Sequence, residues 1–129
     1  MVKDAESNSA QGFDPVIFAS LLRQYREVSP SDTPQRWLLL EAAHIVGQPR
    51  FKPHLETHAL MLRLALQTRD GGEVAGQIMR LLLVPLGHAL GRLPAGNPGR
   101  SNISAFQRMP VRSDIAAVIT KASRHASNK

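Results

Sequence analysis

The sequence predicts an all-α protein: an up-down bundle of about four helices, followed by a Gly/Pro-rich loop and a C-terminal helix. Three observations predict this class. Apolar residues recur every three or four positions in several stretches, and helix start or stop signals border each stretch. No stretch alternates apolar and polar residues for more than a few positions, as a half-buried strand would. The 129 residues, 43% of them hydrophobic and 20% charged, suffice for one domain with its own core.

The first helix is marked by an aspartate and a proline. Asp14 can accept hydrogen bonds from the free N–H groups of the first turn, and Pro15 favours the first helical position. Phe13 is spaced to contact Phe18 across this helix start. Because the residue before a proline disfavours helical geometry, we expect the helix to end near Val28, before a Ser-Pro pair.

The second and third helices are separated by a short turn and should form an antiparallel hairpin. Thr33, followed by a proline, starts the second helix, and Gly47 closes it. Pro53 opens the third helix. We expect that helix to end near Arg69, where an Asp-Gly-Gly turn follows.

The fourth helix begins after Asp70, which with Glu73 has the spacing of a capping box. Gly76 lies inside this helix, at a cost of about 1 kcal/mol relative to alanine, so we expect close packing against a neighbour there. Pro85 must kink or end the helix, because proline removes one backbone hydrogen bond and clashes with the preceding turn. A short continuation to about Leu90 is expected.

A long loop and one more helix complete the chain. Glycine, proline, asparagine and serine dominate residues 94–110, where the helical period is lost. Ser113 can cap a last helix from Asp114 to about Ser123. The sequence therefore predicts a single helical domain, residues 13–124, between disordered tails at residues 1–12 and 125–129.

Composition and charge exclude several classes of function. The chain has no cysteine, hence no disulfide, no thiolate metal site and no cysteine nucleophile. No apolar run reaches the roughly 18 to 20 residues that span a bilayer, and the N-terminus lacks an apolar signal core, so we expect a cytoplasmic protein. The net charge is +6, of which +5 falls in residues 100–129. This excess favours a solvated helix surface over nucleic-acid binding, because no nucleic-acid motif accompanies it.

Four of the five histidines can share one end of the predicted bundle. His54 and His58 are four residues apart and so lie on one helix face, and His44 lies about one turn before the hairpin loop. Counting residues across the next turn places His88 close to the level of His54. We therefore expect all four imidazoles beside the loop that begins at Pro94.

This placement predicts a metal site. His44, His54 and His58 are the best candidate ligands, because imidazoles on facing helix turns can hold one ion. Glu41, three residues before His44, is a candidate fourth ligand or an acceptor for an imidazole N–H, and His88 is a further candidate ligand. Nitrogen and oxygen donors suit Zn²⁺, Ni²⁺, Co²⁺ or Fe²⁺. The alternative is a set of ordinary hairpin-end histidines that bond to water and nearby carboxylates.

Four further polar residues are candidate contacts to a ligand or to the loop. Gln77 and Arg80 are three apart on one helix face and could bond the loop, although the pattern slightly favours a solvated polar stripe. Asn97 lies in a Gly-Asn-Pro-Gly segment that could present N–H groups to an anion, although the simpler interpretation is a turn. Gln48 directly follows the second helix.

Five short motifs follow one another along residues 15–120. They read E-x-A-H-I-V-G-Q, H-x-x-x-H-x-x-M-L, G-Q-x-x-R-L, P-x-G-N and Met-Pro, and begin at Glu41, His54, Gly76, Pro94 and Met109. In this order they resemble the motifs of an uncharacterised bacterial family of small helical proteins, a domain of unknown function.

The resemblance implies that Glu41, His44, His54 and His58 belong to the family's motifs, which strengthens the case for a metal or ligand site. Two loop positions depart from the pattern. Pro98 stands where the family has threonine, and Arg100 stands where it has glycine. A histidine at position 88 is not part of the pattern.

Three functions are compatible with these features. The favoured one is a small soluble bacterial protein that binds a divalent transition metal between the second and third helices. The second is a helical protein-protein interaction module or homo-oligomer without metal, since those two helices resemble a tetratricopeptide-type pair. The third and least favoured is nucleic-acid binding through residues 100–129. We expect no catalytic residues and lean against an enzyme, since no serine stands in a nucleophile elbow.

Overall fold

The computed structural model describes residues 12–128, and over that range the protein is all-α with no β-strand. The fold class expected from the sequence is confirmed. The expected N-terminal tail lies outside the described residues, except for Gly12. The five helices are α2 (Pro15–Glu27), α3 (Thr33–Gly47), α4 (Phe51–Gln67), α5 (Gly71–Leu90) and α6 (Ser113–Ser127).

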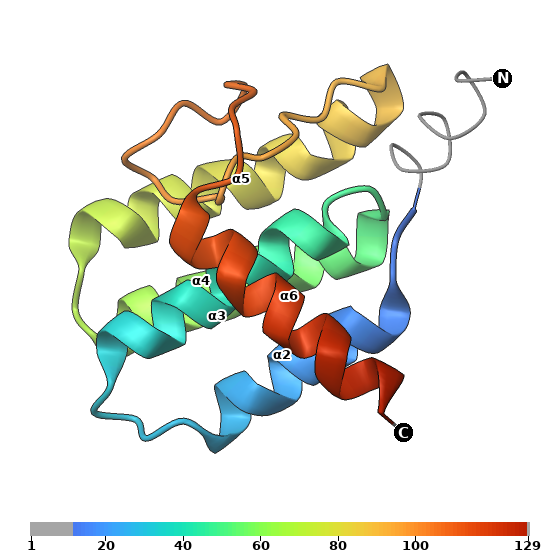
Figure 1. The fold of residues 1–129 in the computed structure, drawn as a ribbon. Coiled ribbons are helices and arrows are strands. Elements are labelled where there is room, and N and C mark those ends of the chain that lie inside the picture. The colour runs from blue at the N-terminus through green and yellow to red at the C-terminus, as the bar shows by residue number, and fades with distance from the viewer. Residues whose placement is uncertain (1–11, 129) are drawn as a thin grey trace, which may run out of the picture.

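The helices pack in chain order, and the last one crosses back over the first two. Helix α2 packs on α3, α3 on α4 and α4 on α5, while α6 lies across α3 and α2 (Figure 1). Among the described helices, α5 therefore contacts α4 alone. The connection 91–112 contains no helix and returns along α5 before α6 begins. The 91–112 connection thereby covers the region where α3, α4 and α5 lie side by side.

The apolar core lies between α2, α3, α4 and α6. Its largest fully buried apolar side chains come from these four helices: Leu21, Leu39, Leu40, Met61, Leu64 and Ile115. The single Trp37 and Tyr25 are buried beside them. Helix α5 contributes no buried residue to this core and packs only the partly buried Val74 against it, so α5 depends on other contacts for its attachment.

The helix starts follow the sequence signals closely. Asp14 Oδ1 accepts hydrogen bonds from the N–H groups of Val16 and Ile17, and the ring of Phe13 lies 5.5 Å from that of Phe18. Helix α3 starts at Thr33 as expected, and Asp32 caps it by accepting a hydrogen bond from the N–H of Gln35. Asp70 caps α5 as expected, but the Glu73 carboxylate bonds the loop instead of completing a capping box.

Two helices, α4 and α6, differ in their bounds from the sequence-based expectation. Helix α4 begins at Phe51, two residues before Pro53. Helix α5 continues through Pro85 to Leu90, as the sequence predicted. Helix α6 begins at Ser113 without a side-chain cap and extends to Ser127, so most of the expected C-terminal tail is helical.

No helix within residues 12–128 combines the length and the apolar character needed to cross a membrane.

Candidate metal centre

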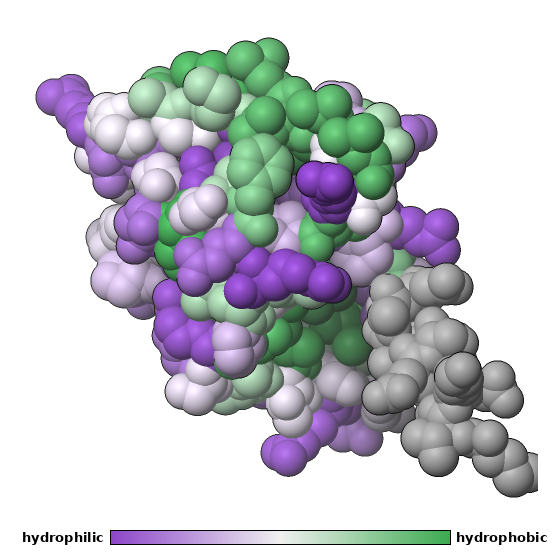
Figure 2. Space-filling model, turned by 90° about the horizontal axis from the view of Figure 1, so that it is seen from above, coloured by the Kyte–Doolittle hydropathy of each residue, from purple (hydrophilic) through white to green (hydrophobic). Residues whose placement is uncertain are grey.

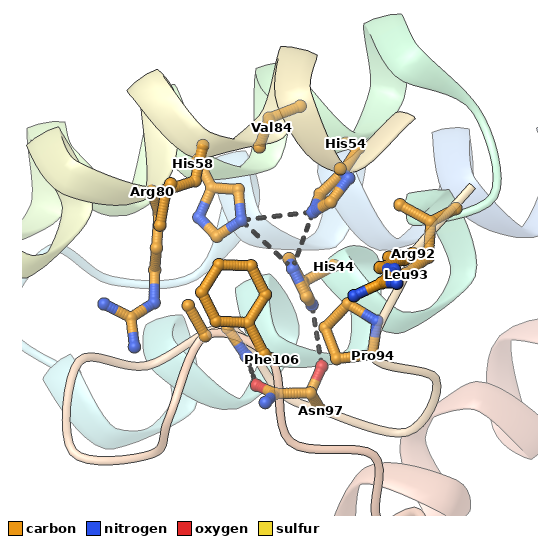
Figure 3. A pocket seen from close by; sticks show the side chains of 14 residues that line it. His44, His54, His58, Arg80, Val84, Arg92, Leu93, Pro94, Asn97 and Phe106 are labelled. Carbon is orange, nitrogen blue, oxygen red and sulfur yellow. Dashed lines mark hydrogen bonds between the residues drawn. The ribbon is translucent and has the colours of Figure 1, made fainter. Parts of the chain in front are cut away.

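Three imidazoles converge where α3, α4 and α5 meet the 91–112 loop (Figure 3). His44 comes from the last turn of α3, whereas His54 and His58 come from consecutive turns of α4. Their Nε2 atoms are 3.1 Å apart for His44 and His58, and 3.2 Å apart for each of the other two pairs. All three residues are buried. The expected clustering of these histidines at one end of the bundle is thus observed.

The outer nitrogen of each imidazole has its own hydrogen-bond partner. His44 Nδ1 lies 2.8 Å from the Asn97 carbonyl oxygen, and His58 Nδ1 lies 2.8 Å from Gln77 Oε1. His54 Nδ1 lies 2.9 Å from His88 Nε2. A loop carbonyl, a helix side chain and a fourth histidine thereby orient the three rings.

These partners fix the tautomers of two imidazoles. A carbonyl oxygen only accepts, so His44 must donate its Nδ1–H to Asn97. The Gln77 amide nitrogen donates to Glu73 and to the Gly99 carbonyl, so its Oε1 faces His58 and accepts the Nδ1–H of that ring. In the neutral state, His44 and His58 therefore direct two unprotonated Nε2 lone pairs at each other.

The remaining pair has a choice of proton position. If His54 donates Nδ1–H to His88, its Nε2 adds a third lone pair to the cluster. If His88 donates instead, His54 Nε2 carries a proton that can lie between the other two nitrogens. The His54–His88 pair can thus supply or withdraw one proton at the cluster.

The surroundings keep the cluster neutral. Burial lowers the pKa of His44 well below its ordinary value near 6.5, and the adjacent imidazoles lower it further. Burial and neighbouring imidazoles lower the pKa of His54 to about 3. Burial, partly offset by the Gln77 hydrogen bond, lowers the pKa of His58 to about 4. Burial also lowers the pKa of His88. Proton competition for the ring nitrogens is therefore weak near neutral pH.

A cavity of about 40 Å³ opens beside the three imidazoles. All three rings line it, and Val84 of α5 and Leu93, Pro94 and Phe106 of the loop form apolar walls (Figure 3). Arg80 and Arg92 also line the cavity.

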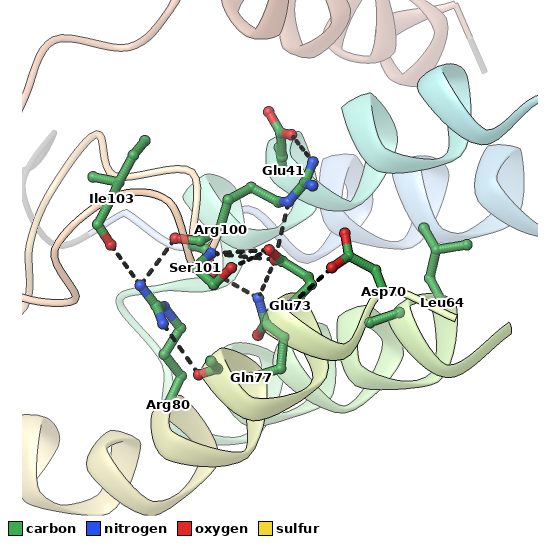
Figure 4. A network of polar contacts seen from close by, with 12 residues as sticks. Glu41, Leu64, Asp70, Glu73, Gln77, Arg80, Arg100, Ser101 and Ile103 are labelled. Carbon is green, nitrogen blue, oxygen red and sulfur yellow. Dashed lines mark hydrogen bonds and ion pairs between the residues drawn. The ribbon is translucent and has the colours of Figure 1, made fainter. Parts of the chain in front are cut away.

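A polar network attaches the loop to α5 beside the cluster (Figure 4). Glu73 accepts from the Arg100 guanidinium at 3.0 Å and from both the N–H and the hydroxyl of Ser101. Burial alone would raise the pKa of Glu73, but hydrogen bonds from Ser101 and Gln77 and the charge of Arg100 lower it. Arg80 donates to the carbonyls of Arg100 and Ile103. These contacts hold the loop that presents Asn97 to His44.

Two glycines allow the loop to approach this closely. Gly99 has a φ of +89°, and a Cβ there would lie 2.8 Å from the His44 ring. A Cβ at Gly76 would collide with Ser101. The close packing expected at Gly76 therefore exists, but against the loop rather than another helix.

Arg100 links the site to the core. Besides Glu73, its guanidinium contacts the Glu41 carboxylate at 3.2 Å and lies 3.7 Å from the centre of the Trp37 ring. Arg112 bonds the other Glu41 oxygen at 2.7 Å. Arg100 thus supplies a cation that joins α3, α5 and the loop.

The structure places the other predicted site residues as follows. Glu41 is held by two arginines and is not among the residues whose ligand atoms converge. His88 is hydrogen-bonded to the outer nitrogen of His54 and is not one of the three converging rings. Asn97 organises the loop through bonds to the carbonyls of Ser104 and Gln107. Gln48 is buried, and its amide nitrogen has no hydrogen-bond partner within residues 12–128.

The slightly favoured interpretation of Gln77 and Arg80 as a solvated polar stripe is wrong. Both side chains are buried and bond the loop. Sequence reasoning also missed Glu73 and Arg100 as site residues. The spacing along α5 could have identified Glu73, because Glu73, Gln77 and Arg80 lie on the helix face that also carries His88.

The fold and site define a class: a small all-helical protein with a buried cluster of three histidines. The chain belongs to the family described as Protein of unknown function (DUF3703), which matches residues 15–119. The resemblance to an uncharacterised family is thereby confirmed. Comparisons with curated proteins and with solved structures give no match.

Proposed function

We propose that this protein binds one divalent transition metal ion through the Nε2 atoms of His44, His54 and His58. One observation carries the proposal: His44 and His58 direct unprotonated Nε2 atoms at each other across 3.1 Å. Two lone pairs at that distance repel, whereas a cation between them is attracted to both. Their outer hydrogen bonds keep both rings in this tautomer.

The spacing of the three nitrogens agrees with a single ion. In tetrahedral coordination with metal–nitrogen bonds of about 2.0 to 2.1 Å, neighbouring nitrogens lie about 3.3 Å apart. The three observed separations are 3.1 to 3.2 Å, so an ion needs only a slight opening of the cluster. Little reorganisation of the side chains is required.

The groups behind the ligands favour metal binding as well. Ligating imidazoles commonly donate their other N–H to a carbonyl or a side-chain oxygen, which fixes the ring and raises its basicity. The Asn97 carbonyl and the Gln77 amide do this for His44 and His58. His88 can accept the corresponding proton from His54. With their Nδ1–H groups on these acceptors, the three rings leave their Nε2 atoms free to face an ion.

The donor set limits the choice of metal. Three imidazole nitrogens suit Zn²⁺, Ni²⁺, Co²⁺ or Fe²⁺, whereas Ca²⁺ and Mg²⁺ prefer oxygen. Glu41 is paired with Arg100 and Arg112, so we do not assign it as the fourth ligand. The proposed role is metal binding, as in storage, sensing or delivery, without an assigned reaction.

Metal content of protein produced without an affinity tag tests the proposal. Protein purified from metal-supplemented cells should contain close to one ion per chain by elemental analysis. The double variant His54→Ala/His58→Ala should lose it, whereas His125→Ala, on the exposed end of α6, should keep it.

Two controls make this result decisive. Far-ultraviolet circular dichroism shows whether the double variant keeps its helices, and the milder His54→Gln/His58→Gln pair replaces it if it does not. Wild-type protein that stays metal-free after exposure to each of the four ions would overturn the proposal.

A further inference from the structure

This inference rests on the proposed metal site. We infer that the bound ion keeps one coordination position open to the cavity and takes a small inorganic monoanion there. Three protein ligands leave at least one position of a tetrahedral metal vacant. All three imidazoles line the same cavity, so that position faces it.

The charges around the cavity favour an anionic ligand. Of the described residues that line the cavity, Arg80 and Arg92 are charged, and none is Asp or Glu. Glu73, whose charge acts on His58, is already paired with Arg100. Because the three imidazoles are neutral, they do not offset the +2 charge of a divalent ion. The two arginines add further positive charge. An anion entering the cavity neutralises part of this excess.

Size and polarity limit the ligand further. A volume of about 40 Å³ holds two or three water-sized groups. Most of the remaining wall is apolar, formed by Val84, Leu93 and Phe106 among others, and gives a larger polar molecule few hydrogen-bond partners. The site therefore favours a diatomic or triatomic monoanion over tetrahedral oxyanions and carboxylate metabolites.

Cobalt substitution with azide as the probe tests this inference. Co²⁺ added to the metal-free protein should give visible absorption bands, and azide should shift them in a saturable manner. Sodium sulfate at equal ionic strength should leave the bands unchanged. Val84→Phe, which fills the cavity, should keep the cobalt bands and lose most of the azide response.

The outcomes separate the two proposals. Cobalt bands that do not respond to azide would overturn the open position and leave the metal site standing. A protein that gives no cobalt bands would contradict the metal site itself. If Val84→Phe does not fold, Val84→Leu provides a smaller obstruction. A shift by azide that is equally strong in a folded Val84 variant would place the anion elsewhere and overturn the inference.

A second, independent observation concerns the outer face of α5. Five large apolar side chains on this face are 47 to 70% exposed: Ile78, Met79, Leu82, Leu86 and Leu90. Figure 2 shows apolar side chains gathered on the side of the molecule that α5 forms. The only charged side chains between residues 71 and 90 are Glu73 and Arg80, and both are buried. We propose that a second copy of this chain covers this face through its own α5.

The spacing of the exposed residues favours another helix as the occupant. Ala75, Met79, Leu82, Leu86 and Ala89 alternate steps of four and three, the seam of a two-helix coiled coil. The stripe is uncharged, so two copies of a chain with a net charge of +6 meet without repulsion at the contact. A twofold axis makes the same stripe self-complementary.

The area is sufficient for a dimer. Covering the five large side chains on both copies would bury about 1,000 Å², at the low end of specific protein interfaces. We therefore expect a dimer that dissociates on dilution rather than an obligate one.

Sedimentation equilibrium over a range of protein concentrations tests the dimer. Wild-type protein should approach twice the monomer mass at high concentration, and Leu82→Glu/Leu86→Glu should remain monomeric. Val16→Glu, which adds the same charge at a 57% exposed position on α2, should still dimerise. Wild-type protein that is monomeric at every concentration would overturn the proposal. So would dimers of unchanged affinity in the Leu82/Leu86 variant, or a monomer whose α5 face binds vesicles of anionic phospholipid.

Discussion

The inner face of α5 buries Glu73, Gln77 and Arg80, whereas its outer face leaves Leu82 and Leu90 more than half exposed. A surface helix usually has the opposite polarity, with its apolar stripe on the core. Here α5 is attached to the loop through carboxylate, amide and guanidinium groups. The difference between the two faces shows that α5 serves the histidine site on one side and is free to meet a partner on the other.

The largest expected effect is the pH dependence of the metal-free protein, since the inner face borders the buried imidazoles. The folded pKa values lie below the unfolded value near 6.5, about 4 for His58 and about 3 for His54. The unfolded chain therefore binds more protons between about pH 6.5 and pH 4. Stability is full above this window and falls as the pH falls, by about 1.4 kcal/mol per pH unit for each buried histidine.

Urea unfolding in the presence of a chelator measures this dependence. The free energy of unfolding should fall by roughly 5 kcal/mol from pH 7 to pH 5 if His44, His54 and His58 all contribute. A variant with glutamine at all three positions should show a much flatter profile. If that variant showed an equally steep profile, the pH dependence of stability would come from groups other than these histidines.

Arg80→Leu should cause the next largest loss. It removes the hydrogen bonds to the carbonyls of Gly76, Arg100 and Ile103, which leaves partly buried acceptors without partners. We expect a loss of about 3 kcal/mol in the free energy of unfolding. Arg63→Leu, at an exposed position on α4, should change it by less than about 0.5 kcal/mol. Equal effects of the two substitutions in denaturant titrations would argue against a special role for the inner face.

Gln77→Leu tests how the inner face supports the metal. It removes the acceptor that holds His58 in its Nδ1–H tautomer. Affinity for the metal should fall by about 10- to 100-fold, while the stoichiometry at saturation stays the same. Competition with a chromophoric chelator measures the affinity. Unchanged affinity in a folded variant would show that the Gln77 hydrogen bond does not orient the ligand.

Leu82→Gln on the outer face should have the smallest effect. Its side chain is 70% exposed, so the stability of the monomer at low protein concentration should change by less than about 0.5 kcal/mol. A loss near that of Arg80→Leu would mean that the outer face already stabilises the monomer.

Periodicity and capping residues predicted the helices well because these signals are local. Asp14 and Asp70 cap helices where expected, and α3 spans the expected residues. The same counting placed four histidines at one end, since rise per residue sets their level. It could not give the rotation of each helix. Glu41 was therefore predicted as a candidate ligand, although α3 directs it toward Arg100 and Arg112.

The loop was the part that the sequence could not predict. Its glycines and prolines indicated turns, but not which carbonyl would meet His44 or which groups would meet Arg80. Those contacts join residues far apart in the chain and depend on how the loop returns along α5. The apparent solvated stripe at Gln77 was misread for this reason, because its partner at Gly99 is 22 residues away.

The contact between Arg100 and Trp37 gives the molecule an internal optical reporter. Trp37 is the only tryptophan in the chain, and its ring lies under a guanidinium from the loop that also presents Asn97 to His44. Any loosening of that loop changes the electrostatic environment of the one indole. Intrinsic fluorescence thus reports on whether the histidine cluster is closed, without a label.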